Sequence, residues 1–295
     1  MSSIDEGYEH ITEQLIRNSR SPREISPKNV FQPANKANRP LINQILKDLL
    51  LEGSHLRGYE HLQELYRRCR AGDSCLILME HYSNFDIPGL YYFLEAQGDE
   101  GSVVADAIVS MAGMKLNVES DFIRAFTEAY SRIVIYPSRS LESVSDPDHR
   151  VTEERRAKQI NNAALHHMVR LKHEGHLILV FPTGTRYRPA QPETGRVLPV
   201  VDSYIKSFDN MVMIGIAGNI LRVAEEGVMT SDRVARDVVV YNVGEVVDCR
   251  SFRDEIRSAE KTGAAAKAAV ASVVQERLKR LHDDADAIRR QYLPK

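Results

Sequence analysis

The sequence predicts an α/β fold in which a mixed sheet is covered by helices and preceded by a small helical region. From residue 72 onward, short apolar runs alternate with stretches of helical periodicity, and this alternation is typical of a sheet with covering helices. The first part of the chain differs, because its periodic segments are helical. We therefore expect a helical N-terminal region at residues 1–70 and an α/β domain at residues 71–295.

The N-terminal region predicts three helices around one loop. Residues 4–16 show helical periodicity, and residues 41–51 and 59–70 have the pattern of amphipathic helices. Residues 19–40 are rich in Pro, Ser and Asn, which is typical of a loop.

The α/β domain predicts a series of buried strands. The apolar runs that we expect to form them are residues 75–79, 103–109, 132–136, 177–181, 211–216 and 237–243. The helices expected between them are residues 87–97, 119–130 and 153–174. Residues 263–292 are Ala-rich and predict one long C-terminal helix.

Composition excludes several classes of protein. A chain of 295 residues with 43% apolar residues can bury a full core, and its net charge of −2 argues against nucleic-acid binding. Cys69, Cys75 and Cys249 form no CxxC pair, which favours a reducing compartment. No apolar stretch approaches the ~18 residues of a membrane span, and the N-terminus lacks the apolar core of a signal peptide. We expect a cytoplasmic or stromal-like protein, at most peripheral to a membrane.

The segment His81-Tyr82-Ser83-Asn84-Phe85-Asp86 follows the first expected strand of the α/β domain. Histidine can transfer protons near neutral pH, and a carboxylate can fix its tautomer and stabilise the imidazolium. If the chain turns from strand into helix here, Asp86 can fold back toward His81. The alternative is a polar histidine with Asp86 as a helix N-cap.

The segment Phe181-Pro182-Thr183-Gly184-Thr185-Arg186-Tyr187-Arg188-Pro189 follows another expected strand. Gly184 allows a close turn, and amide groups around it, near a helix start, would form an anion site. Arg186 and Arg188 carry guanidinium groups suited to phosphate and would project to one side if the backbone is extended. The alternative is a surface turn with solvated arginines. Arg139, after the expected strand at residues 132–136, could join them, or it could be a solvated loop residue.

The two segments, in this order and separation, resemble the glycerolipid acyltransferases, whose motifs are H-x4-D and a Pro-x-Gly-x-Arg turn. The resemblance covers roughly residues 72–220 and is strongest to the soluble plastid-type glycerol-3-phosphate acyltransferases, which carry R-x-R-P after the turn. This chain departs from that pattern where Ser140 follows Arg139, and where Gly215 stands at a position that is Pro in many relatives.

The resemblance implies a glycerol-3-phosphate 1-O-acyltransferase of phospholipid biosynthesis. It implies that His81 and Asp86 are catalytic, that Gly184, Arg186, Arg188 and Arg139 bind the acceptor phosphate, and that no metal or cofactor is needed. The acyl donor would be acyl-carrier protein or acyl-CoA.

Several points stay open. A carrier protein could dock on Arg150, Arg155, Arg156 and Lys158, although the interleaved Glu153 and Glu154 favour a solvated helix face. The acyl chain could lie along residues 91–94, which could equally be core. The acceptor could instead be lysophosphatidic acid, which Thr183 disfavours because the membrane-bound acyltransferases carry Glu there. A non-catalytic module that binds a phosphoanion or lipid is the alternative of another class.

Overall fold

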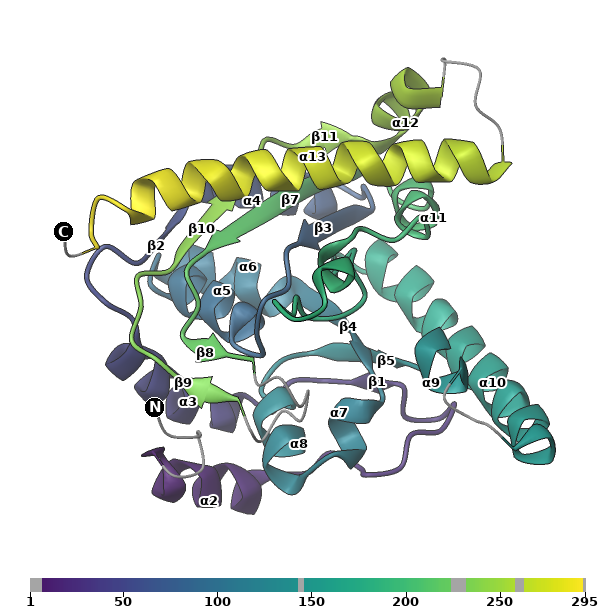
Figure 1. Ribbon diagram of the computed structural model, residues 1–295, viewed down its shortest axis with the longest axis horizontal. Coiled ribbons are helices and arrows are strands. Elements are labelled where there is room, and N and C mark those ends of the chain that lie inside the picture. The colour runs from purple at the N-terminus through teal and green to yellow at the C-terminus, as the bar shows by residue number, and fades with distance from the viewer. Residues whose placement is uncertain (1–6, 143–145, 224–231, 258–262, 294–295) are drawn as a thin grey trace.

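A central sheet organises the protein. The computed structural model describes residues 7–142, 146–223, 232–257 and 263–293. Within these residues nine strands form one sheet, in the order β1-β5-β4-β6-β3-β7-β10-β2 with β11 beside β7 (Figure 1). The strands are β1 (Phe31–Gln32), β2 (His55–Arg57), β3 (Cys75–Met79), β4 (Ile108–Gly113), β5 (Arg132–Ile135), β6 (Leu177–Val180), β7 (Asn210–Ala217), β10 (Val240–Val243) and β11 (Val247–Asp248). A separate two-stranded ribbon pairs β8 (Leu221–Arg222) with β9 (Arg233–Val234).

Five neighbouring strands, from β5 through β4, β6 and β3 to β7, run parallel, and β1 and β10 flank them antiparallel. Along β3, Cys75, Ile77 and Met79 pack into one apolar core, and Leu76 and Leu78 pack into the core on the other face. This alternation, with both faces covered, explains why the strand is apolar at every position. Parallel strands also bring their carboxyl ends to one edge of the sheet, where the motif segments follow.

Helices cover both faces. The core on one face includes residues of α2 (Glu9–Asn18), α3 (Arg39–Leu49), α4 (Tyr59–Arg70), α5 (Asp86–Glu95), α6 (Asp99–Ala107) and α8 (Asp121–Thr127). The core on the other face includes residues of α10 (Pro147–His173), α11 (Val201–Lys206), α12 (Cys249–Arg257) and α13 (Gly263–Arg289). The short elements are α7 (Lys115–Val118), α9 (Ser138–Glu142), η1 (Lys36–Asn38) and η2 (Pro192–Gly195).

The longest helices carry many charges. α10 and α13 are each 27 residues long, and α13 lies across β7 and β10 (Figure 1). None of the helices within the described ranges combines the length and the apolar character that a membrane crossing requires.

The predicted fold class is confirmed, but one expected strand is partly wrong. Residues 103–107 belong to α6, and the strand there begins only at Ile108. Gly101 allows this helix to approach α5 closely, because a Cβ on it would lie 1.9 Å from the carbonyl oxygen of Leu94, so α6 packs against α5 at backbone contact. Val104 is buried by this packing while Val103 is 49% exposed, a pattern set by the helix and not by strand propensity.

The N-terminal segment contributes to both edges of the sheet. β1 pairs with β5, and β2 pairs with β10. The loop before β1 is held by Glu128, whose carboxylate accepts hydrogen bonds from Ser19 Oγ and from the amides of Arg20 and Ser21 at 2.8–3.1 Å. The division into regions 1–70 and 71–295 stays a prediction.

Candidate active site

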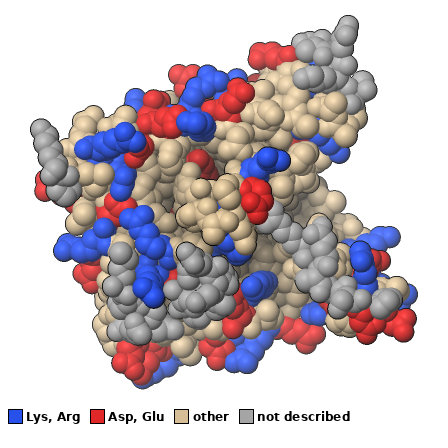
Figure 2. Space-filling model, in the orientation of Figure 1, with Lys and Arg blue, Asp and Glu red and all other residues tan. Residues whose placement is uncertain are grey.

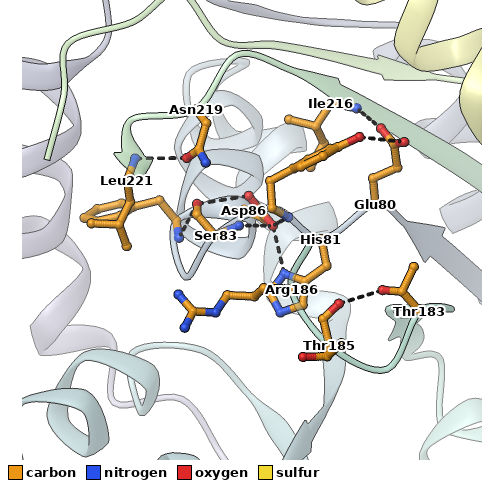
Figure 3. Close-up of polar contacts among 12 residues, drawn as sticks. Glu80, His81, Ser83, Asp86, Thr183, Thr185, Arg186, Ile216, Asn219 and Leu221 are labelled. Atoms are coloured by element: carbon orange, nitrogen blue, oxygen red, sulfur yellow. Dashed lines mark hydrogen bonds and ion pairs between the residues drawn. The ribbon is translucent and has the colours of Figure 1, made fainter. Parts of the chain in front are cut away.

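The two motif segments meet at the carboxyl ends of β3 and β6. These strands pair in parallel with Leu78 opposite Val180, so each segment leaves the sheet at the same edge. The imidazole of His81 stacks on Phe181, with ring centroids 3.7 Å apart and planes inclined by 10°. The amide of Tyr187 donates a hydrogen bond to the carbonyl of His81 at 2.8 Å. Residues separated by about a hundred positions therefore form one site (Figure 3).

His81 and Asp86 contact each other directly. His81 Nδ1 lies 2.8 Å from Asp86 Oδ2. Because a carboxylate only accepts hydrogen bonds, Nδ1 carries the proton, and Nε2 is the basic nitrogen of the neutral ring. This is the arrangement needed for a histidine base oriented by a carboxylate.

Asp86 is fixed by the turn that precedes α5. Its Oδ2 accepts hydrogen bonds from the amides of Tyr82 at 2.6 Å and Ser83 at 2.9 Å, and its Oδ1 accepts from Ser83 Oγ at 3.1 Å. Phe85 occupies the N-cap position of α5, and Asp86 is the first residue of the helix. Asp86 therefore does not act as the N-cap; its oxygens bind the loop that carries His81.

The environment of His81 favours the neutral form of its ring. Its side chain is 16% exposed, and burial lowers its pKa, with Arg186 contributing in the same direction. The hydrogen bond and the charge of Asp86 oppose this shift without cancelling it. A neutral imidazole is the form that can accept a proton near pH 7.

The amides of the histidine loop are engaged within it. Acyl transfer needs donors for an oxyanion, and the backbone N–H groups between Ser83 and Asp86 are candidates close in sequence to His81. The amide of Ser83 donates to Asp86, that of Phe85 donates to Ser83 Oγ at 3.1 Å, and that of Asp86 donates to the Ser83 carbonyl at 3.3 Å. These three groups hold the turn, which leaves them poorly placed to bind a reacting oxygen.

Arg186 lies near His81, whose pKa its charge helps to lower, but it is already paired. Its Nη1 donates to Asp232 Oδ2, and the two side chains are 7% and 0% exposed. The two residues lie 46 positions apart in the sequence, so no local pattern signals the pair. The positive charge of Arg186 thus has a buried carboxylate partner within the protein.

Gly184 and Arg188 complete the second segment. Gly184 has φ +67°, and its amide closes a turn onto the carbonyl of Phe181 at 3.0 Å. Arg188 is half-buried, its amide donates to Thr194 Oγ1 at 2.8 Å, and its buried Nε has no hydrogen-bond partner among the described residues. The expected helix start is absent here, because the next described helical segment is η2, which begins only at Pro192. The arginines therefore provide the positive charge of this segment.

Arg139 follows another strand of the sheet, β5. It belongs to α9, which follows β5, and its side chain lies outside the described part of the structure. β4 lies between β5 and β6 in the sheet. Two strand spacings separate β5 from β6 by about 10 Å. That Arg139 belongs to the site stays a prediction.

A narrow cleft lies behind the base. It is lined by polar atoms of the histidine loop and by apolar residues of other elements, among them Ser83, Gly89, Leu46, Ile220 and Tyr241. Gly89 is required there, because a Cβ on it would lie 2.3 Å from Tyr241 Oη, which donates to the carbonyl of Asp86 at 2.9 Å. Of the residues suggested for an acyl channel, Tyr91, Phe93 and Leu94 lie in the core.

Sequence reasoning missed the groups that reach the site from distant segments. Asp232 pairs with Arg186, and His282 of α13 contacts Glu80, the residue that precedes His81. Gly215 is the one sequence feature that hinted at the α13 contact. A Cβ at this position would lie 2.5 Å from the amide nitrogen of His282. Gly215, which stands where many relatives have Pro, therefore lies at the contact between α13 and β7.

Comparison with known proteins identifies the family of the chain. No curated protein matches the chain. A family model described as Acyltransferase matches residues 54–213, which is more than half of the 295 residues and includes both motif segments. The chain therefore belongs to the acyltransferase family.

Proposed function

We propose that this acyltransferase is a glycerol-3-phosphate 1-O-acyltransferase that uses His81 as a general base. One observation carries the proposal. The His81–Asp86 pair and the arginine segment leave neighbouring parallel strands, and Tyr187, which stands between the two arginines, donates its amide to the His81 carbonyl. A base and an anion-binding segment are then held at a fixed separation, which suits an acceptor with a hydroxyl and a phosphate.

The reaction is a direct transfer. His81 Nε2 takes the proton of the glycerol hydroxyl as the hydroxyl oxygen forms a bond to the thioester carbon. The carbon–sulfur bond then breaks, and the departing thiolate receives the proton from the imidazolium. Asp86 stabilises the imidazolium between these steps through Nδ1. No covalent acyl-enzyme is needed.

The acceptor phosphate lies toward Arg186 and Arg188. Arg188 is the better placed to change partners, because its Nε has no hydrogen bond within the described structure while Arg186 is paired with Asp232. We assign to Arg188 the direct contact with phosphate and to Arg186 a fixed positive charge beside the base. Arg139 would complete the set. Bidentate guanidinium contacts suit a phosphate dianion.

The thioester donor, acyl-carrier protein or acyl-CoA, is anionic and would approach over a basic surface. Figure 2 shows basic side chains gathered over β8, β9 and the C-terminal end of α13, beside a hollow. Arg222 and Arg233 stand directly opposite each other in the β8–β9 ribbon, and both are exposed. Arg222 is paired with Asp237 at 3.1 Å, and Arg233 adds an exposed positive charge opposite it, which an anionic partner would meet at this surface.

The previously suggested docking cluster on α10 fits a donor less well. Arg150 pairs with Glu154 and Arg156 with Glu153, and α10 lies on the far side of the molecule from β8 and β9 (Figure 1). Arg233→Glu should raise the KM for the donor, and Arg155→Glu on α10 is the matched control. An equal effect of both variants would contradict this assignment.

Two other functions remain as alternatives. Lysophosphatidic acid could be the acceptor in the same chemistry, with Thr183 as the feature against it. A non-catalytic module that binds a phosphoanion or lipid would need no oriented base, so the His81–Asp86 contact argues against it.

The test is acyl transfer from a long-chain acyl thioester, with glycerol 3-phosphate and lysophosphatidic acid offered in parallel. We expect product from glycerol 3-phosphate with the wild type, and a loss of about 10²–10⁴-fold in kcat with His81→Ala. A circular dichroism spectrum identical to wild type shows that the variant is folded. Product from lysophosphatidic acid alone would replace glycerol 3-phosphate as the proposed acceptor and leave the proposed mechanism unchanged. Near-normal turnover by folded His81→Ala would refute the mechanism.

A further inference from the structure

A second polar cluster adjoins the base, and the transfer mechanism does not use it. It consists of Glu80, Tyr82 and His282. Glu80 Oε2 lies 3.1 Å from His282 Nδ1, and Tyr82 Oη donates to Glu80 Oε1 at 3.0 Å. Tyr82 Oη also lies 3.1 Å from His282 Nδ1. Glu80 and Tyr82 flank His81 in the sequence, whereas His282 comes from the C-terminal helix.

Glu80 holds the chain immediately before the base. Its side chain is 13% exposed, and its Oε2 accepts the amide of Ile216 in β7 at 2.9 Å. Its own amide donates to the carbonyl of Ile214 at 3.1 Å. The residue before His81 is thus fixed to β7 through both its backbone and its side chain.

Tyr82 holds the chain immediately after the base. Its hydroxyl is bound to Glu80, while its amide makes the 2.6 Å hydrogen bond to Asp86 Oδ2. Burial and nearby Glu80 raise the pKa of Tyr82, so its hydroxyl stays protonated and keeps donating. A shift of the Tyr82 ring would therefore move an amide that orients the carboxylate partner of His81.

α13 places His282 within reach by backbone contact with β7. Gly215 has no space for a Cβ against the backbone of Leu281 and His282. Leu281 also packs within 3.2 Å of the Cβ position of Gly244. The backbone at His282 is therefore held against β7, which keeps the residue within reach of Glu80.

Electrostatics favour the same arrangement. The hydrogen bond to Glu80 raises the pKa of His282, against the effect of burial, and the charges of Glu80 and of Asp286 on α13 act in the same direction as that hydrogen bond. The groups that face the ring are Glu80 and Tyr82 from the end of β3, with Asp283 and Asp286 on its own helix. A hydrogen bond to a charged carboxylate is stronger than one between neutral groups.

We propose that His282 is a positioning residue for the catalytic base: through Glu80 and Tyr82 it holds the backbone on both sides of His81 and the amide that orients Asp86. This inference rests on the proposed acyl transfer at His81. His282 does not touch the reacting atoms in this scheme; it keeps the His81–Asp86 geometry in place.

The test compares three variants of α13. His282→Leu removes the ring nitrogen, and His282→Asn keeps an amide donor at the position of Nδ1. Leu281→Ala loosens the same helix contact but leaves His282, so it is the packing control. We expect His282→Leu to lower kcat about tenfold with the acceptor KM unchanged, because one hydrogen bond to a charged group is lost. His282→Asn should recover most of that loss.

An NMR titration of the His81 ring separates this proposal from the proposed function. We expect the His81 pKa to rise in His282→Leu, because the loosened loop lets water reach the imidazole and weakens the Tyr82 bond to Asp86. The His81 signal is assigned with His81→Ala. If His282→Leu does not fold, His282→Gln replaces it. The Gln amide lies one bond further from the backbone than the Asn amide, so it does not occupy the position of Nδ1.

The outcomes are distinct. An unchanged His81 titration in His282→Leu overturns the positioning role, as does an equal rise of the His81 pKa in Leu281→Ala. A wild type that transfers no acyl group, together with a shifted His81 titration in His282→Leu only, counts against the proposed function and supports the role of His282.

Discussion

The Arg186–Asp232 pair offers a quantitative test of the site. Both side chains are almost fully buried, at 7% and 0% exposure. Replacing Arg186 with Met removes the guanidinium that pairs with the buried carboxylate, and replacing Asp232 with Leu removes the carboxylate that pairs with the buried guanidinium. The double replacement removes both charges.

The burial of the pair determines the magnitude. Removing one partner of a buried ion pair costs about 3–5 kcal/mol, because the remaining charge is desolvated and uncompensated. Replacing both partners with apolar residues of similar volume is often neutral or stabilising. We therefore expect each single variant to lose about 3–5 kcal/mol of the free energy of unfolding, and the double variant to lie close to wild type.

Urea denaturation of the four proteins measures these free energies, since the midpoint and slope give the stability of each. The coupling energy follows from the double-mutant cycle. A loss of less than about 1 kcal/mol in each single variant, as at an exposed ion pair, would refute the buried pairing. Strictly additive losses in the double variant would refute it as well.

Three further predictions concern the base, the phosphate contact and the helix contact. Because burial lowers the pKa of His81, the acid limb of kcat/KM should have its midpoint below the ordinary histidine value of about 6.5; a pH–rate profile with a midpoint above 7 would contradict a buried neutral base. Arg188→Ala should raise the KM for glycerol 3-phosphate about 10–100-fold through loss of a charged hydrogen bond, and steady-state kinetics with an unchanged KM would remove Arg188 from the site. Gly215→Ala should cost about 1–3 kcal/mol by overpacking against α13, whereas an unchanged melting temperature would show that α13 adjusts without cost.

The sequence predicts buried strands better than edge strands. β3 matches the expected run of residues 75–79, because a strand covered on both faces is apolar at every position. β1 and β2 contain only two and three residues and carry no periodic signal, so they fell within loop and unassigned sequence. α6 was missed over residues 103–107 because its close contact with α5 depends on Gly101, whose neighbour in space no pattern identifies.

The site shows the same limit at the level of side chains. His81 and Asp86 are five positions apart, so a strand-to-helix turn brings them together locally and a sequence pattern can point to them. Arg186 and Asp232 meet only because β6 and the segment before β9 fold to one place. His282 reaches Glu80 across 202 positions through the packing of α13 on β7. Such partners depend on tertiary structure, so single-sequence reasoning has no means to find them.

The position of β3 between β6 and β7 explains why so few side chains are needed to hold His81 in place. On the β6 side the His81 carbonyl accepts the amide of Tyr187, and on the β7 side Glu80 accepts the amide of Ile216. Both donors are backbone groups, so substitutions at Tyr187 or Ile216 that keep the strand and turn conformations leave these anchors intact. Glu80 is different, because its side chain itself makes the contact with β7. The position of His81 therefore depends on the sheet register on the β6 side and on the Glu80 carboxylate on the β7 side. Of these two, the carboxylate is the one that a single substitution can remove.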